Sequence, residues 1–441
     1  MLGSAVSSRS CERGGGEVRA LTIAIEARIT PGIQGGVEQV AVGLAHGLSG
    51  LTDGAETYHF ITTEDSSWLE PYIGENCRII RTSSAEPLGR RRRIAAALPA
   101  ISSAWGTLKR AMVARASTPA QCSVPVSDGT VEKLGAEVVH FTMQVAYLTE
   151  IPCIYHPHDL QHLHFPEFFS AAAVAWRQLH YRAFCEQAVE VSVTTEWGKQ
   201  DLIEHYDLPP EKIVVVPLAP AVATYGPLDQ MDAERMVSEL GVLGSYAFYP
   251  AQTWPHKNHL RLVEAVNYAR AVLGSDVRVV CSGLQNEHYS EVKSRVEELN
   301  LGNAIKFVGF VEARAVQALY QQARLMIFPS LFEAAGGFGP VFEAFEIGVP
   351  VATSSATSLR EQAGDAALVF DPTDERDMAS CMVRLWDDEK LRSELVRRGR
   401  IRVAQFTWDR VARTFRAHYR RIAGVPLTPE DHAILNATSP F

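Results

Sequence analysis

The chain has 441 residues, of which 46% are hydrophobic, and a formal net charge of −9. A domain usually takes roughly 100–200 residues, so this length and apolar content predict two packed domains. The acidic balance argues against nucleic acid as a partner, and the sequence has no run of about 20 apolar residues that would predict a transmembrane helix.

The seven cysteines are scattered along the chain, and none forms a CxxC pair. This pattern predicts reduced thiols in a cytoplasmic protein, not a disulfide framework or a zinc site. Residues 1–18 are rich in Ser and Gly and lack the apolar centre of a signal peptide, so we expect a disordered tail there.

Short apolar segments alternate with helical patterns through the first half of the chain. The first segment, Ala20–Ile25, precedes the pair Gly35 and Gly36, which opens a helical pattern over Val37–Leu48. Glycines at that point let the backbone pass close to a ligand. Further strands are expected at Tyr58–Thr62, Arg78–Arg81, Glu137–Phe141, Cys153–Tyr155, Val189–Thr194 and Lys212–Val216.

A basic segment, residues 89–116, contrasts with the acidic chain because it mixes seven arginines and lysines with apolar residues. One interpretation is an amphipathic surface that contacts anionic lipid on the inner face of a membrane and meets a lipid-linked acceptor there. The other is a solvated basic helix beside a loop. Both stay open at this point.

Histidines cluster directly after the strand Cys153–Tyr155, at positions 156, 158, 162 and 164. Their spacing raises the question of a metal site, but no carboxylate or cysteine completes a familiar ligand pattern. We therefore expect no metal here. His158, at a strand end on the side of a cleft, is expected to make a polar contact with substrate, and the others to pack or cap helices.

The second half repeats the alternation after a segment, residues 219–244, that is expected to link a first domain (19–218) to a second (245–407). Alternating strands and helices predict an α/β protein with doubly wound parallel sheets and ligands at the carboxyl ends of the strands. Residues 408–441 are expected to form helices that cross back to the first domain. The strands are expected at Tyr246–Tyr249, Val277–Ser282, Ile305–Val308, Leu325–Phe328, Val349–Thr353 and Ala367–Phe370.

Lys257 stands where a strand passes into the helical pattern Leu260–Ala271, between His256 and Asn258. An ammonium group beside a helix N-terminus can neutralise a diphosphate. A solvated lysine in a loop is the simpler alternative, so the position of Lys257 carries more weight than its residue type.

The segment Ser330–Thr353, SLFEAAGGFGPVFEAFEIGVPVAT, is the most informative stretch of the chain. Glycines allow close approach to a ligand, and Pro340 suits the first turn of a helix whose N-terminus attracts phosphate. Glu333 and Glu343 flank the loop, where they could accept hydrogen bonds from sugar hydroxyls. The pattern indicates a site for a sugar attached to a phosphate, although Gly and Pro alone also suit an ordinary strand–helix turn.

Together these features resemble glycosyltransferase family 4, the retaining enzymes of the GT-B fold, from about Leu21 to Arg421. The stretch Gly337–Ala344, GFGPVFEA, is similar to the end of the family's glutamate–seven residues–glutamate element. Gly35–Glu38 matches its first glycine loop, and Ile305–Phe310 looks like the strand and loop that border the nucleotide base. The fold that this implies is two Rossmann-like domains facing an inter-domain cleft.

The resemblance implies a role for each matching residue. The expected catalytic residues are His158, Glu333 and Lys257, with His158 near the reacting carbon, Glu333 on the donor sugar and Lys257 on the diphosphate. Glu343 is expected to hold the ribose hydroxyls. The full set of expected donor-binding residues is Gly35, Gly36, Gln252, Lys257, Asn258, Gly337, Phe338, Gly339, Pro340, Val341 and Glu343.

Two departures from the family pattern matter. Nine residues separate Glu333 from Glu343, two more than usual, whereas the Pro340–Ala344 end, which contains Glu343, aligns with the family element. The arginine that commonly precedes the lysine by five positions is here Gln252, whose amide can hydrogen-bond a phosphate without neutralising it. Lys257 and the helix N-terminus would then carry more of the charge, or another basic residue substitutes.

The implied function is transfer of a hexose, mannose being one candidate, from a GDP- or UDP-linked donor to a glycan or lipid-linked acceptor in polysaccharide or glycoconjugate synthesis. No metal or cofactor is expected, because lysine and helix dipoles stabilise the leaving diphosphate. Two rivals stay open. One is another GT-B enzyme such as a sugar-nucleotide epimerase, and the other is a degenerate, non-catalytic partner subunit, which the altered glutamate spacing and Gln252 would suit.

Overall fold

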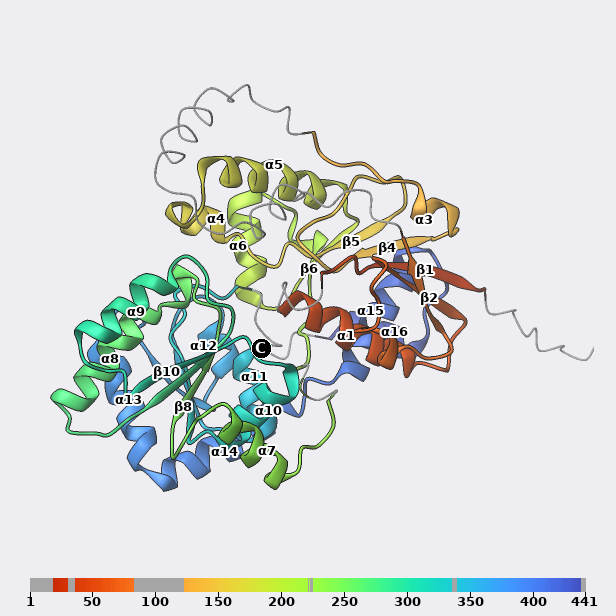
Figure 1. Ribbon diagram of the computed structural model, residues 1–441. Helices are drawn as coiled ribbons and strands as arrows, with labels where there is room; N and C mark the ends of the chain where they lie inside the picture. Colours follow the sequence, from red (N-terminus) through yellow and green to blue (C-terminus); the bar gives the residue numbers. More distant parts are fainter. Residues whose placement is uncertain are drawn as a thin grey trace, which may run out of the picture.

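The computed structural model describes residues 19–30, 36–82, 123–220, 222, 225–334 and 339–437. Four of the sequence predictions lie outside these residues: the tail 1–18, Gly35, the basic segment 89–116, and the pair Gly337 and Phe338. The described residues form two parallel β-sheets, each covered by helices, which appear as two bodies in Figure 1.

The first sheet has the strand order β3-β2-β1-β4-β5-β6-β7, and all its neighbours are parallel. The chain runs outward from β1 to β3 and then returns to pair β4 on the other side of β1. This reversal between β1 and β4 is the switch point at which such sheets bind ligands. The strands are β1 (Leu21–Glu26), β2 (Glu56–Thr62), β3 (Cys77–Arg81), β4 (Val138–Phe141), β5 (Cys153–Tyr155), β6 (Glu190–Val193) and β7 (Ile213–Val215).

The second sheet, of order β10-β9-β8-β11-β12-β13, repeats this plan with its reversal between β8 and β11. Each strand expected from the sequence is present, with ends that differ by at most two residues. The strands are β8 (Ala247–Pro250), β9 (Val279–Ser282), β10 (Ile305–Gly309), β11 (Leu325–Phe328), β12 (Val351–Ser354) and β13 (Ala367–Phe370).

Helices cover both faces of each sheet, as doubly wound sheets require. Several begin at a side-chain cap: Thr195 Oγ1, for example, accepts from the Gly198 amide at the start of α6. None of the described helices is long and apolar enough to cross a membrane. The helices are α1 (Gly36–Ser49), α3 (Thr130–Lys133), α4 (Gln161–His164), α5 (Ala171–Gln187), α6 (Glu196–Tyr206), α7 (Gln230–Glu239), α8 (His259–Ala271), α9 (Tyr289–Glu298), α10 (Ala313–Gln322), α11 (Pro340–Ile347), α12 (Leu359–Ala363), α13 (Glu375–Asp387), α14 (Glu389–Val403), α15 (Trp408–Ile422) and α16 (Pro429–Leu435).

Helix α7 forms inside the segment 219–244 that was expected to be a linker. It starts after Asp229, whose carboxylate accepts from the Met231 amide at 2.8 Å, and it packs against α10 of the second sheet. The part of this segment without helical structure is therefore shorter than the sequence suggested.

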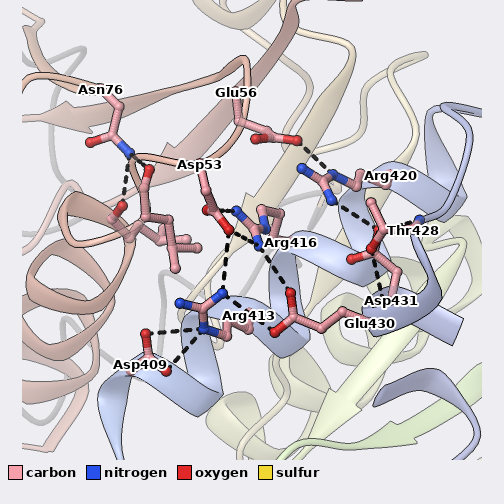
Figure 2. A network of polar contacts seen from close by, with 12 residues as sticks. Asp53, Glu56, Asn76, Asp409, Arg413, Arg416, Arg420, Thr428, Glu430 and Asp431 are labelled. Carbon is pink, nitrogen blue, oxygen red and sulfur yellow. Dashed lines mark hydrogen bonds and ion pairs between the residues drawn. The ribbon is translucent and has the colours of Figure 1, made fainter. Parts of the chain in front are cut away.

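Helix α15 packs against α1 of the first sheet, although it follows the second sheet in the chain. The contact is close enough that a Cβ at Gly43 of α1 would overlap the ring of Trp408. Figure 2 shows the polar side of this contact, where the buried Arg416 pairs with Asp53. Arg420 pairs with Glu56 at 2.6 Å in the same network. These ion pairs join α15 to the loop before β2 and to Glu56 of that strand, so they hold the helix against the first sheet.

Candidate active site

A cleft of about 570 Å³ lies between the two sheets and is lined from both. The first sheet's side contributes the start of α1 with Gly36, and Trp68. The second contributes residues that follow its strands, among them Gln252 after β8, Phe310 after β10 and Glu343 on α11. The carboxyl ends of both sheets thus meet at one cavity, where the sequence predicted a ligand.

Gly283 shows why the wall of this cleft needs glycine. It follows β9 with φ +129°, and a Cβ there would lie 2.5 Å from the carbonyl oxygen of Ala251, which follows β8. A side chain would therefore clash with the backbone and force a conformation that L residues rarely adopt. Gly283 therefore lets the ends of β8 and β9 lie side by side where they line the cleft.

Glu343 lies in the first turn of α11, with its side chain at the cleft. The Tyr320 hydroxyl donates to Glu343 Oε2 at 2.9 Å. Burial raises the pKa of Glu343 to about 7, and the Tyr320 hydroxyl opposes that rise. The group therefore gains or loses its proton near neutral pH, and it is a strong hydrogen-bond acceptor once ionised.

Lys257 and Glu333, which the sequence placed 76 residues apart, form an ion pair. Lys257 ends the 3₁₀ turn Pro255–Lys257 that follows β8, and Glu333 follows β11. These two strands flank the switch point of the second sheet. Both side chains are partly exposed, at 19% and 22%, so a ligand could reach them.

The backbone of Glu333 is held from two sides. Its amide donates to Thr357 Oγ1 at 2.9 Å, and its carbonyl accepts from the hydroxyls of Thr357 and Ser358. Thr357 itself adopts φ +48°, an uncommon conformation for a β-branched residue. These hydrogen bonds fix the backbone of Glu333. The two residues that this chain has in addition to the family spacing lie between Glu333 and Glu343.

The N-terminus of α11 differs in part from the prediction. Gly339 and Pro340 line the cleft, as expected. The Phe342 amide donates to the Gly339 carbonyl at 3.0 Å, so it is engaged inside the helix. The side chain of Val341 is buried in the core at 1% exposure, so only its backbone could face a ligand.

Asn258 also differs from its predicted role in donor binding. Its side chain is buried, and its amide nitrogen donates to the carbonyls of Pro329 and Pro372 at 3.0 and 2.8 Å. With φ +61°, Asn258 turns the chain from Lys257 into α8. It positions Lys257 by joining three loops, and its side chain is occupied by that task.

Gln252 lines the cleft, and its Oε1 accepts from the Trp254 indole at 2.8 Å. This contact fixes the orientation of the amide and leaves its NH₂ group as the donor for a ligand. Lys257 and Arg177 place positive charge near His256, which follows Gln252 in the same loop. The pKa of His256 is lowered to about 2 by burial first, then by the charge of Lys257, with a smaller contribution from Arg177 of α5.

His158 follows β5 in the first sheet with φ +62°. Its Nε2 lies 2.8 Å from the Thr142 carbonyl, so Nε2 carries the proton and Nδ1 is the acceptor in the neutral ring. Burial lowers the pKa of His158 and favours that neutral form. A non-glycine residue held in the left-handed region is a feature often found at functional sites.

The two domains are in contact next to Glu333. Thr195, the cap of α6, donates to the Ala334 carbonyl at 3.1 Å. The Glu361 carboxylate of α12 accepts from the amides of Glu196 and Trp197 at 2.9 and 3.1 Å. A carboxylate from one domain therefore occupies the N-terminus of a helix in the other, where the helix dipole favours negative charge.

Several cleft residues had no signal in the sequence. Tyr225 in the interdomain segment hydrogen-bonds Gln39 of α1, and Tyr320 of α10 reaches Glu343. These contacts join residues that are far apart in the chain, so no spacing rule could have paired them. Gly283 was identifiable in principle as a glycine after a strand.

Comparisons with known proteins identify the family. Residues 241–402 match the family described as Glycosyl transferases group 1, and residues 127–219 match Glycosyltransferase Family 4. The chain is similar to O-antigen chain mannosyltransferase B of Escherichia coli, with 26% identity over 57% of this chain and 66% of that protein. It is also similar to D-inositol 3-phosphate glycosyltransferase of Corynebacterium kroppenstedtii, with 27% identity over 53% and 54% of the two chains. These matches therefore span between half and two thirds of the relatives' lengths.

Solved structures share the fold over nearly the whole chain. Sucrose-phosphate synthase from Thermosynechococcus elongatus has a TM-score of 0.66 at 19% identity, covering 92% of this chain and 99% of that one. Anabaena HepE in complex with UDP and glucose has a TM-score of 0.63 at 15% identity, covering 91% and 100%. The chain belongs to the glycosyltransferases of group 1 and family 4, and its two facing sheets are the GT-B fold.

Proposed function

We propose that the protein transfers a hexose from a GDP- or UDP-linked donor to a glycan or lipid-linked acceptor, with retention of anomeric configuration and without a metal. The observation that carries this proposal is the convergence of Gly36, Gln252, the α11 N-terminus and Glu343 on one interdomain cleft. The similarity to a mannosyltransferase and the fold shared with a UDP-bound structure support a nucleotide-sugar donor.

The nucleoside occupies the part of the cleft between Phe310 and Glu343. Ionised Glu343 accepts hydrogen bonds from the ribose hydroxyls, and such charge-assisted bonds are among the stronger ones in proteins. The Phe310 ring is 50% exposed and lines the cleft, so it offers an apolar face to the base. Tyr320 holds the Glu343 carboxylate in place through its hydroxyl.

The diphosphate lies between the Gln252 amide, Lys257 and the start of α11. Gln252 supplies a hydrogen bond and no charge, so the neutralisation depends on Lys257 and the helix dipole.

Glu333 and Lys257 act as a pair. Bound diphosphate draws the Lys257 ammonium toward itself, and the Glu333 carboxylate then accepts hydrogen bonds from hydroxyls of the donor sugar. The hydrogen bonds with Thr357 hold the Glu333 backbone and do not involve its side chain, so this exchange needs no movement of the main chain. His158 Nδ1 accepts from another sugar hydroxyl near the reacting carbon.

In the chemical step the bond between the anomeric carbon and the leaving phosphate oxygen breaks, and its electron pair stays on the phosphate. The acceptor hydroxyl oxygen bonds to the anomeric carbon from the same face. Its proton passes to the departing phosphate oxygen, so no protein base is needed. Lys257 and the helix N-terminus stabilise the charge that develops on the diphosphate, which is commonly the largest contribution to catalysis.

Thermal shift with GDP, UDP and their hexose conjugates tests donor binding, since a ligand that binds only the folded protein raises its melting temperature. We expect one nucleotide class to stabilise the wild type, Lys257→Ala to lose most of that shift, and Lys390→Ala, an exposed lysine on α14, to keep it. An equal shift in Lys257→Ala would contradict the diphosphate site. Donor binding with no turnover would favour the partner-subunit alternative, and an altered sugar without any acceptor would favour an epimerase.

A further inference from the structure

Three side chains outside the cleft meet at the end of α4 and along α6. His164 is the last residue of α4, and Asp201 and His205 stand one turn apart on α6. None of the three lines the cleft of the described residues. The sequence offered His164 within a histidine cluster that lacked a carboxylate, and the fold supplies that carboxylate from a helix 37 residues further on.

The three ligand atoms lie within 4.8 Å of one another. His164 Nε2 is 2.7 Å from Asp201 Oδ1, and His205 Nδ1 is 3.1 Å from the same oxygen. Ligands at about 2.0–2.2 Å from a tetrahedral ion are roughly 3.3–3.6 Å apart, so an ion fits after a small outward movement of the rings. His205 Nδ1 also lies 2.9 Å from the Asp201 carbonyl, and metal binding would replace that contact.

Burial of the carboxylate contrasts with exposure of the rings. The Asp201 side chain is 4% exposed, whereas those of His164 and His205 are 27% and 34% exposed. A buried carboxylate is usually paired with a cation, bound to a metal or protonated. The open side of the two imidazoles gives an ion access from solvent and leaves room for a water ligand.

The surroundings hold the His164 ring in position. It lies 5.6 Å from the Trp197 ring of α6 and 5.1 Å from the Phe332 ring, measured between ring centroids. Phe332 comes from the second domain and directly precedes Glu333. An ion at this point would therefore connect α4 and α6 of the first domain at the place where they meet the second.

We propose that His164, Asp201 and His205 form a binding site for a divalent transition metal, for which Zn²⁺ is the best probe. Two imidazoles and one carboxylate are a donor set typical of zinc, whereas magnesium and calcium prefer oxygen ligands alone. The site takes no part in the transfer chemistry. It joins two helices that support the domain contact through Phe332.

Calorimetric titration of the chelator-treated full chain with ZnCl₂ tests the proposal. The parent protein for this test, and every variant made from it, carries serine in place of Cys11 and Cys122, so that these thiols cannot take up zinc. We expect one tight site, weakened more than tenfold in His205→Gln, because loss of even an outer-shell partner of a metal ligand costs roughly 10- to 100-fold. His46→Gln, which removes an exposed histidine on α1, should bind as the parent does.

Asp201→Asn provides a second variant of nearly the same size, and its zinc affinity should fall by a similar factor. A circular dichroism spectrum and melting curve for each variant show whether it is folded. If the parent takes up no zinc, or if His205→Gln and Asp201→Asn both bind as tightly as the parent, the three residues form only a hydrogen-bonded cluster and the proposal is wrong.

Discussion

Glu343 combines a cost to stability with a predicted role in binding, and one substitution separates the two. Moving the pKa of a carboxyl group from 4.5 to about 7 corresponds to a cost of about 3 kcal/mol for ionising it in the folded protein, at about 1.4 kcal/mol per pKa unit. The folded protein holds this proton to a higher pH than the unfolded chain does. The free energy of unfolding therefore falls as pH rises from about 4.5 through about 7.

Glu343→Gln removes the ionisation cost and keeps an oxygen that accepts from Tyr320. We expect the variant to melt several degrees above the wild type at pH 8, where the carboxylate is ionised. Near pH 5 the two proteins should melt at similar temperatures, because the carboxyl group is protonated in the folded wild type. The measurement is a series of melting curves from pH 5 to pH 8.5. Glu346→Gln, an exposed glutamate on the same helix, is the matched control.

Nucleotide binding should change in the opposite direction. A hydrogen bond to a charged group contributes about 1.5–3 kcal/mol and one to a neutral group about 0.5–1.5 kcal/mol, so Glu343→Gln should weaken GDP or UDP binding roughly five- to thirtyfold at pH 8. The difference should shrink at pH 6, since Glu343 is then mostly protonated in the free wild type. Equal nucleotide affinity at pH 8 would refute the ribose role, and equal melting shifts at pH 5 and pH 8 would refute the raised pKa.

Three further predictions rest on other contacts. Gly283→Ala should lower the urea midpoint by the equivalent of about 2 kcal/mol or more, because φ +129° and the nearby carbonyl both oppose a Cβ, whereas Gly302→Ala, with open space around it, should not. Glu333→Gln should bind nucleoside diphosphate more tightly in calorimetry, because Lys257 loses the carboxylate that neutralises its ammonium group, while turnover should fall. Weaker diphosphate binding would contradict the proposed exchange within the Lys257–Glu333 pair. Arg420→Ala should destabilise the protein by about 3–5 kcal/mol, because two buried carboxylates lose their partner, and Arg413→Ala, whose pairs are more exposed, should cost far less in the same unfolding experiment.

The sequence predicted most of the fold because its signals are local. Apolar segments bounded by glycine and proline located the strands, and Pro340 marked the start of α11. The helix α7 was missed because the prolines before it and its acidic residues suggested a linker. Its N-cap, Asp229, was the overlooked signal.

The site was predictable only in part. Gln252 and Lys257 could be placed directly after β8 from the sequence, because parallel strands present their carboxyl ends to one edge of the sheet, and Gln252 does line the cleft. Asn258 was assigned to the ligand because nothing in the sequence shows which loops its amide ties together. The hydrogen bonds that hold the Glu333 backbone and the contact between His164 and Asp201 join distant segments of the chain, so no local pattern encodes them.

The most direct test of the central claim is ¹H NMR of the wild type with an α-linked GDP- or UDP-hexose, with the acceptor fraction or with water as a slow acceptor. We predict loss of the donor's anomeric signal, release of nucleoside diphosphate, and first appearance of a product with the α configuration, all abolished in Lys257→Ala. A β-configured first product would contradict retention. An unchanged donor spectrum with every nucleotide sugar and acceptor would contradict the proposed transfer itself.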